Sequence, residues 1–220
     1  MPRQCAACSL PGLVLCTGCR IDVRAQPVIA VDATVSAVSD PMGRGRAVVR
    51  GYKVGGHRSL APVIAESLAR AIRQSLHPQR GSTRVAIVAV PQRRRAHAAR
   101  GFDSTAVIAR QAARLLTLHG LECDVVQGVQ YVRQPDDQRG LGVADRYLNV
   151  AGSMRLTGKA SGRVCSEQFG MVVAVDDVVT TGATLAELRR SLVAGGALCV
   201  GAAAAFSTPR IAHPGSTSPG

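Results

Sequence analysis

Two adjacent carboxylates, Asp176 and Asp177, follow an apolar run, and a loop of small and hydroxyl-bearing residues comes next: Thr180, Thr181, Gly182, Ala183 and Thr184. The backbone N–H groups of such a loop, and of the helix that it opens, favour a phosphate. The two carboxylates can accept hydrogen bonds from a diol or hold a divalent cation. Together they suit a ribose 5-phosphate, whereas a helix cap beside two solvated acids does not explain the combination. A Walker loop is excluded, because the sequence has no Gly-Lys-Ser or Gly-Lys-Thr.

Four of the seven cysteines form two Cys-x-x-Cys pairs: Cys5, Cys8, Cys16 and Cys19. Two such turns make the tetrahedral sulfur cage that zinc prefers, with a redox pair and an iron–sulfur cluster as the alternatives. Because four thiolates leave no coordination position open for water, we expect one structural zinc ion per chain. A segment this short has no core of its own, so its fold should depend on the ion.

Alternating helix and strand patterns position these residues. Three stretches carry apolar residues at helical spacing: 59–76, 103–119 and 184–194. Asp103 is the expected N-cap of the second helix, and Thr184 with Glu187 fits a capping box at the start of the third. Four apolar runs predict strands: 85–90, 123–126, 171–175 and 197–205. The order predicts an α/β fold with a mainly parallel sheet flanked by helices.

The formal net charge is +13, from 27 basic and 14 acidic side chains. Residues 1–110 hold 17 basic and 5 acidic side chains, a net of +12, against 10 and 9 in residues 111–220, a net of +1. This asymmetry suits a polyanionic partner, either nucleic acid or a phosphate-rich small molecule, although the strong preference for Arg over Lys can also reflect base composition. A hydrophobic content of 46% argues against wholesale disorder, and three Phe, three Tyr and no Trp argue against an aromatic platform for single strands.

The region from Val175 to Thr184, Val-Asp-Asp-Val-Val-Thr-Thr-Gly-Ala-Thr, resembles the motif with which type I phosphoribosyltransferases bind phosphoribosyl pyrophosphate (PRPP). With the cysteine pairs, residues 5–206 resemble the ComF/GntX branch of that fold. Three further segments agree: Gly51-Tyr52-Lys53, Val90-Pro91 with Arg100-Gly101-Phe102, and Gln138-x-x-Leu141-x4-Arg146-x-x-Asn149. One departure is visible, since Asp103 and Ser104 stand where the branch usually continues with Asn-Gln.

The resemblance implies a role for each matching residue. Asp176 and Asp177 would be the catalytic pair at the ribose 2′- and 3′-hydroxyls, and the loop from Thr180 to Thr184 would cradle the 5′-phosphate. Pyrophosphate, bridged by Mg²⁺, would lie against the loop after Pro91, where four arginines could neutralise it: Arg93, Arg94, Arg95 and Arg100. Four more residues would lie on the substrate side: Lys53, Gln138, Arg146 and Asn149.

The cysteine spacing predicts a zinc knuckle at 1–25, and the resemblance implies a phosphoribosyltransferase-like domain at 26–206 with a hood or insertion at 26–58. The stretch at 207–220 is rich in Pro, Gly and Ser, which predicts a flexible tail. No apolar signal segment follows Met1, and no apolar run approaches the ~20 residues that span a bilayer. We therefore expect a cytoplasmic protein without membrane insertion.

The implied activity is transfer of phosphoribosyl from PRPP, with Mg²⁺ and release of pyrophosphate, to an unknown acceptor. No carboxylate follows Asp177 within the loop to handle a base proton, which disfavours purine salvage. Two alternatives remain open. One is a PRPP sensor without turnover, and the other is an adaptor in DNA uptake and competence that works with single-stranded DNA and a helicase-like partner. A homo-oligomer is compatible with each.

Overall fold

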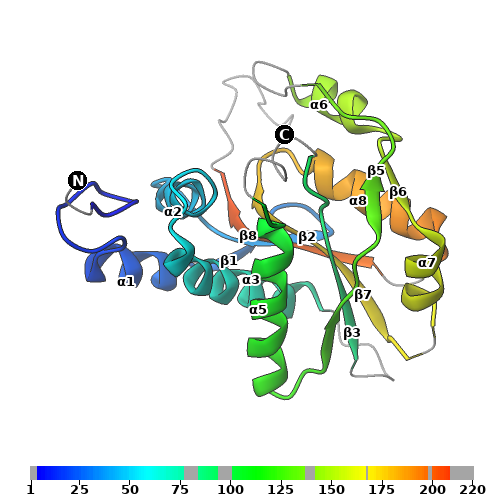
Figure 1. Ribbon diagram of the computed structural model, residues 1–220, viewed down its shortest axis with the longest axis horizontal. Coiled ribbons are helices and arrows are strands. Elements are labelled where there is room, and N and C mark those ends of the chain that lie inside the picture. Colours follow the sequence, from blue (N-terminus) through cyan, green and yellow to red (C-terminus); the bar gives the residue numbers. More distant parts are fainter. Residues whose placement is uncertain are drawn as a thin grey trace, which may run out of the picture.

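A six-stranded sheet forms the centre of the computed structural model, which describes residues 4–76, 84–93, 101–136, 142–166, 168–197 and 200–208 (Figure 1). Its strands lie in the order β1-β2-β8-β7-β3-β4. Their bounds are β1 (Val28–Ala30), β2 (Val35–Val38), β3 (Val85–Ala89), β4 (Cys123–Val125), β7 (Met171–Val179) and β8 (Val200–Ser207). Every neighbouring pair is parallel except β1 with β2. The predicted α/β fold with a mainly parallel sheet is confirmed.

Helices cover both faces of this sheet (Figure 1). The α-helices are α1 (Thr17–Ala25), α2 (Arg44–Lys53), α3 (Ala61–Ser75), α5 (Ser104–Leu118), α6 (Val143–Val150), α7 (Gly158–Val164) and α8 (Ala183–Ala194), and a 3-10 turn, η1 (Arg58–Leu60), precedes α3. A separate antiparallel pair consists of β5 (Val129–Tyr131) and β6 (Met154–Leu156). Within the described residues, no helix is both long and apolar enough to cross a bilayer.

Alternate residues of β7 serve two separate cores, as the two-residue period of a strand requires. Val173 and Val175 pack with the buried faces of α3 and α5. Val172 and Ala174 pack with the buried face of α8. Both faces of the strand are therefore covered, which explains its continuous apolar sequence.

The strand β7 is longer than the predicted strand at 171–175, and this changes the setting of the diacid. It pairs with β3 only as far as Val175, but it stays paired with β8 as far as Val179. On the β8 side the register stays constant to the end of the strand, with Asp176 opposite Ala204 and Val178 opposite Phe206. Asp176 and Asp177 thus lie on a strand that overhangs its neighbour.

The helix caps agree with the sequence in one case and differ in another. The Asp103 carboxylate accepts the Ala106 N–H at 2.9 Å, which confirms the predicted cap of α5. The predicted capping box of Thr184 and Glu187 is wrong, because α8 begins one residue earlier and its N-cap is Gly182. Glu187 is instead buried, where it accepts the Met154 N–H at 2.9 Å and pairs with Arg190.

Candidate functional site

The two carboxylates of β7 lie where β3 has ended. The last bond of the β3 ladder runs from the Val90 N–H to the Val175 carbonyl at 2.8 Å. Two residues further on, the Asp177 N–H donates to Asp176 Oδ1 at 2.8 Å. One carboxylate therefore satisfies the backbone of the overhanging strand and fixes the orientation of the pair.

Asp177 is buried and is held by two other elements. The Lys53 ammonium, at the end of α2, forms an ion pair with its carboxylate. The Thr105 hydroxyl, in the first turn of α5, donates to Asp177 Oδ2 at 3.4 Å. Lys53, predicted on the substrate side, thus contacts the diacid directly, and Thr105 was not predicted at all.

Asp176 is only partly buried, yet its charge is disfavoured. Burial and the neighbouring Asp177 carboxylate raise the pKa of Asp176 to about 7, although the Lys53 charge acts in the opposite direction. A cation or a hydrogen-bond donor at this edge would favour the ionised form. The pair is therefore poised to take up a proton, a metal ion or a hydroxyl donor near neutral pH.

Tyr131, on β5, connects the diacid with the loop that follows β3. Its hydroxyl lies near both Asp176 and Arg93, and burial together with the Asp176 charge raises the pKa of Tyr131 to about 12. Arg93, predicted to face a pyrophosphate, also donates to the Asp136 carbonyl at 3.3 Å. Pro91, half-buried, begins this loop directly after the β3 ladder. Tyr131 was not predicted, because nothing in its sequence context distinguishes it from a core tyrosine.

The loop between β7 and α8 is short and exposes Thr180. The Thr181 hydroxyl accepts the Ala183 N–H at 3.4 Å, and the Thr181 carbonyl accepts the Tyr147 hydroxyl at 2.9 Å. Gly182 has φ +84°, a conformation that side chains strongly disfavour. A side chain there would also lie 3.5 Å from Asp32 Oδ2 and 3.5 Å from the Tyr147 hydroxyl. Ala183 is buried and Thr184 half-buried in the first turn of α8.

The α6 residues named from the sequence have different surroundings. The Asn149 side chain bonds to the Asp136 backbone in both directions, at 2.9 and 3.1 Å, so it shapes the loop that Arg93 contacts. The Arg146 Nε is buried and, within the described part of the chain, has no hydrogen-bond partner. Four predicted residues lie outside the described residues: Arg94, Arg95, Arg100 and Gln138.

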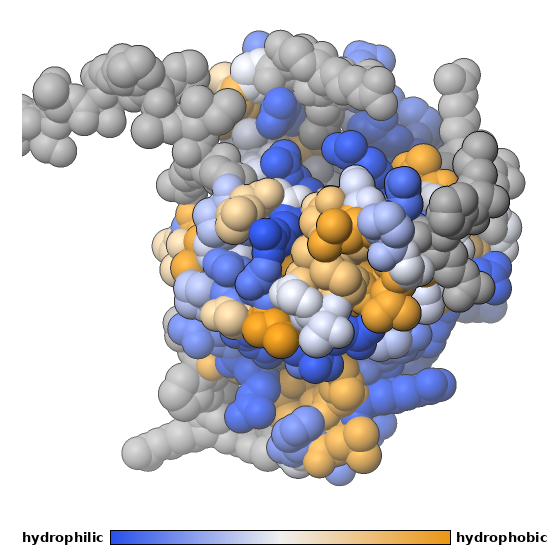
Figure 2. Space-filling model, turned by 90° about the vertical axis from the view of Figure 1, so that its left-hand side faces the viewer, coloured by the Kyte–Doolittle hydropathy of each residue, from blue (hydrophilic) through white to orange (hydrophobic). Residues whose placement is uncertain are grey.

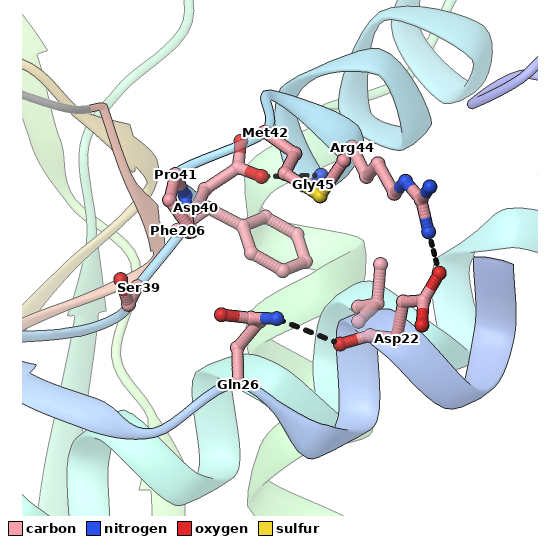
Figure 3. Close-up of a pocket in the computed structure, with 10 residues that line it drawn as sticks. Asp22, Gln26, Ser39, Asp40, Pro41, Met42, Arg44, Gly45 and Phe206 are labelled. Carbon is pink, nitrogen blue, oxygen red and sulfur yellow. Dashed lines mark hydrogen bonds and ion pairs between the residues drawn. The ribbon is translucent and has the colours of Figure 1, made fainter.

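A small cavity of about 160 Å³ lies beside the start of α2, close to α1 (Figure 3). The buried Asp40 carboxylate accepts the N–H groups of Gly45 and Arg46, each at 2.9 Å, and Arg44 pairs with Asp22. A side chain at Gly45 would lie 2.4 Å from the Phe206 ring. These contacts anchor the beginning of α2, whose far end carries Lys53, and thereby position that ammonium.

The four N-terminal cysteines converge as predicted. Their sulfur atoms all lie within 4.8 Å of one another, and Cys8 Sγ is 3.7 Å from Cys16 Sγ. A tetrahedral site with Zn–S bonds of about 2.3 Å has S–S edges of about 3.8 Å, so the group can hold a structural metal ion such as zinc. Burial alone would raise the pKa of Cys5, but backbone N–H donors lower it to about 6.

The cysteine segment packs on the main core and does not stand free. Cys5, Leu15 and Cys19 are buried in the same cluster as α3 and α5. On the outer side, exposed apolar residues flank the cysteines: Leu10, Leu13 and Ile21. Figure 2, which views this side of the molecule, shows apolar patches interrupted by hydrophilic side chains.

Comparison with known proteins identifies similar proteins but no family. No family model matches the chain. The chain is 35% identical over 141 residues to the DNA utilization protein YhgH of Salmonella typhi, and equally to that of Salmonella typhimurium. The match covers 62% of this chain and 57% of each relative, so the chain spans little more than half the length of these curated proteins.

Proposed function

We propose that the protein binds PRPP with Mg²⁺ at the end of β7 and has a type I phosphoribosyltransferase-like fold. The observation that carries the proposal is the overhanging diacid, followed within the same chain segment by a Thr-Thr-Gly turn and the N-terminus of α8. A strand end of this kind is where open α/β sheets bind phosphorylated ligands. The proposed domains remain 1–25, 26–206 with a hood at 26–58, and a tail at 207–220, although Ser207 is the last residue of β8 and residues 209–220 lie outside the described ones. Of the hood segment, β1 and β2 are strands of the central sheet.

The roles of the binding residues follow from their chemistry. Asp176 and Asp177 would accept hydrogen bonds from the ribose hydroxyls, which requires the Lys53 ammonium to shift or to share the carboxylate. Thr180, Thr181, Gly182, Ala183 and Thr184 would supply hydroxyl and backbone donors to the 5′-phosphate. Arg93 and Arg100 would face the pyrophosphate beside Pro91, with Lys53, Gln138, Arg146 and Asn149 towards the substrate.

In the proposed reaction, an acceptor nucleophile forms a bond to ribose C1 while the C1–pyrophosphate bond breaks. The developing positive charge on the ribose would lie near the carboxylates, and the leaving pyrophosphate would lie near arginines. Mg²⁺, which the carboxylates of Asp176 and Asp177 could help to hold, would neutralise charge that develops on the leaving pyrophosphate. Binding geometry and charge neutralisation would supply most of the rate enhancement, because the described part of the loop offers no general base.

We also propose that the metal held by Cys5, Cys8, Cys16 and Cys19 is zinc and that its role is structural. Four closely spaced sulfur atoms support this assignment, since zinc prefers tetrahedral thiolates and such a set leaves no site for substrate. Because Cys5 and Cys19 are buried in the main core, an ion bound by the four sulfur atoms would fasten the cysteine segment to the rest of the protein. It would hold α1 against α3.

Calorimetry with Mg²⁺-PRPP tests the binding proposal. The wild-type protein should bind, and Asp177→Asn should weaken binding about 10- to 150-fold, because a hydrogen bond to a charged group contributes about 1.5–3 kcal/mol. Glu122→Gln, an exposed residue just before β4, is the matched control and should bind normally. Absence of heat with wild-type protein would reject the proposal. Pyrophosphate release in an acceptor screen then separates an enzyme from a PRPP sensor.

A second function is favoured by a separate observation. The relatives are named DNA utilization proteins, and the basic excess of this chain lies in residues 1–110. An adaptor in DNA uptake, with single-stranded DNA and a helicase-like partner, would bind oligonucleotides in a salt-sensitive manner. Such binding should survive Asp177→Asn, whereas PRPP binding should not.

A further inference from the structure

The outer surface of α3 and α5 forms an open groove of about 700 Å³, which the proposed function does not use. Its lining positions on α3 and on α5 recur every three or four residues, so each helix presents one continuous face to the groove. Gln111 on α5 lies six residues beyond Thr105, or about 9 Å along the helix, and the groove extends from there away from the diacid. It is therefore separate from the candidate PRPP site.

The floor of the groove is apolar. Pro62 of α3 is exposed and Leu115 of α5 is half-buried, whereas Ala65, Ala69 and Leu116 beneath them are buried. Pro62 and Leu115 therefore offer a guest segment an apolar contact. The described lining contains no Phe, Tyr or Trp, so it lacks the stacking surface that single-stranded nucleic acid uses.

The rim of the groove is basic. It carries four arginines, Arg24, Arg70, Arg73 and Arg114, against the single acid Glu66. Glu66 is already paired with Arg24, through bonds of 3.0 and 2.8 Å. Arg73 and Arg114 are exposed, and neither forms an ion pair with another described residue. The rim therefore has an excess of positive charge facing the groove.

We propose that this groove docks an acidic amphipathic helix of a partner protein. Leucine-type residues at helical spacing would contact the floor, and glutamates or aspartates on their flanks would meet Arg73 and Arg114, which is the helix-in-groove mode of recognition. Arg70 holds the end of α1 at the rim of the groove, because it donates to the Arg24 carbonyl at 3.0 Å and to the Gln26 carbonyl at 2.7 Å. The groove thus joins the cysteine-bearing segment to the main domain at one docking surface.

The test uses the full chain and a fluorescent synthetic helix of about 15 residues, the length of α3. The peptide has leucines on one face and glutamates beside them, and its twin has lysines in place of the glutamates. We expect saturable binding of the acidic peptide only. The double variant Arg73→Glu/Arg114→Glu should weaken it about tenfold or more, by like-charge repulsion across the interface. Arg163→Glu, an exposed arginine of α7, should leave it unchanged.

The double variant Arg73→Gln/Arg114→Gln removes the two charges without reversing them. It replaces the glutamate variant in the binding test if charge reversal lowers the melting temperature. It should still weaken binding severalfold. The proposal is overturned if the acidic peptide does not bind, if both peptides bind equally, or if the arginine variants bind it as wild type does. Labelled oligothymidine is measured in parallel. Binding of the oligonucleotide that depends on Arg73 and Arg114, with none of the peptide, would make this a nucleic-acid surface instead.

Discussion

The cysteine segment and the end of β7 are held in place by different means. The cysteines come from 15 consecutive residues, Cys5 to Cys19, whose sulfur atoms all lie within 4.8 Å of one another, and Cys5 and Cys19 are buried in the main core. The diacid is held by residues far away in the chain, Lys53 and Thr105, and by the pairing of β7 with β8. A local site can be recognised from the spacing of its residues alone. A site built on a sheet persists without a ligand, but its contacts cannot be derived from spacing.

The largest effect should follow loss of the metal. Cys19→Ser should abolish stoichiometric zinc and lower the melting temperature by roughly 10 °C, because the free energy of zinc binding contributes directly to folding. Metal content by plasma mass spectrometry and a thermal melt measure both. Cys165→Ser, an exposed cysteine far from the cluster in sequence, should change neither.

The same variant separates the two regions. Mg²⁺-PRPP affinity should change less than threefold in Cys19→Ser at a temperature where the protein stays folded. A parallel loss of PRPP binding would show that the two regions are one cooperative unit. Stoichiometric iron with visible absorbance in the wild-type protein would contradict the zinc assignment.

The second effect concerns pH. The pKa of Asp176 is about 7 in the folded protein and near 3.8 in the unfolded chain. Between these values the folded state binds the extra proton, so stability falls as pH rises through this window and does not fall further above pH 7. Asp176→Asn keeps the oxygen that accepts the Asp177 N–H but removes the charge. We expect its melting temperature, without Mg²⁺, to exceed that of wild type by about 3–5 °C at pH 8.

The difference between Asp176→Asn and wild type should shrink towards zero at pH 4. For wild-type protein, the affinity for Mg²⁺-PRPP should rise from pH 6 to pH 8 as Asp176 ionises. The variant should bind PRPP more weakly at every pH. Equal melting temperatures at pH 8 would show that the carboxylate pair is not strained.

A smaller effect is expected at the turn before α8. Gly182→Ala should reduce the free energy of unfolding by about 1–2 kcal/mol, because a Cβ disfavours a positive φ. It should also weaken PRPP binding, since the loop carries the proposed phosphate donors. Gly158→Ala is the control, because that glycine begins α7 with open space around it. Chemical denaturation and calorimetry compare the two variants, and equal stability would show that the turn does not require a glycine at position 182.

The smallest effect should come from the ion pair that links α1, which follows the cysteine segment, with α3. Arg24→Ala removes the ion pair with Glu66, in which both side chains are exposed. Such pairs contribute about 0.2–1 kcal/mol, so the change in unfolding free energy should stay within that range and zinc content should not change. Denaturant unfolding at low and high salt measures it. A loss of several kcal/mol would mean that Arg24 holds the cysteine segment in place.

Sequence patterns predicted the elements with strong signals. The apolar runs of β3 and β7 and the helical periods of α3 and α5 were found because each is long or continuous. The strands β1, β2, β5 and β6 were not predicted, since three or four residues are too few to show a period, although the equally short β4 was found at 123–126. The helix α2 was missed because arginines and glycines interrupt its apolar residues. Glu187 gave a false capping signal, because a buried acid bonded to β6 has the same spacing as a cap.

Much the same limit applies to the sites. The cysteine cluster was predicted in full, because its ligands are neighbours in sequence. The approach of Lys53 to Asp177 spans more than a hundred residues and depends on how α2 is anchored at Asp40. Tyr131 and Thr105 gave no signal, since both types are common in ordinary strands and helices. The assignment of PRPP to this edge stays a prediction.

The overhang of β7 has a consequence for how a ligand would enter. Because β3 ends at Ala89, no strand of the described residues pairs with β7 beyond Val175 on the β3 side, so none must first be displaced there. Among the described residues, entry would then need a movement of the Lys53 side chain, which is fast compared with any rearrangement of the sheet. The rate of ligand association at this edge should accordingly be limited by diffusion and electrostatic attraction. The backbone should have the same conformation with and without the ligand.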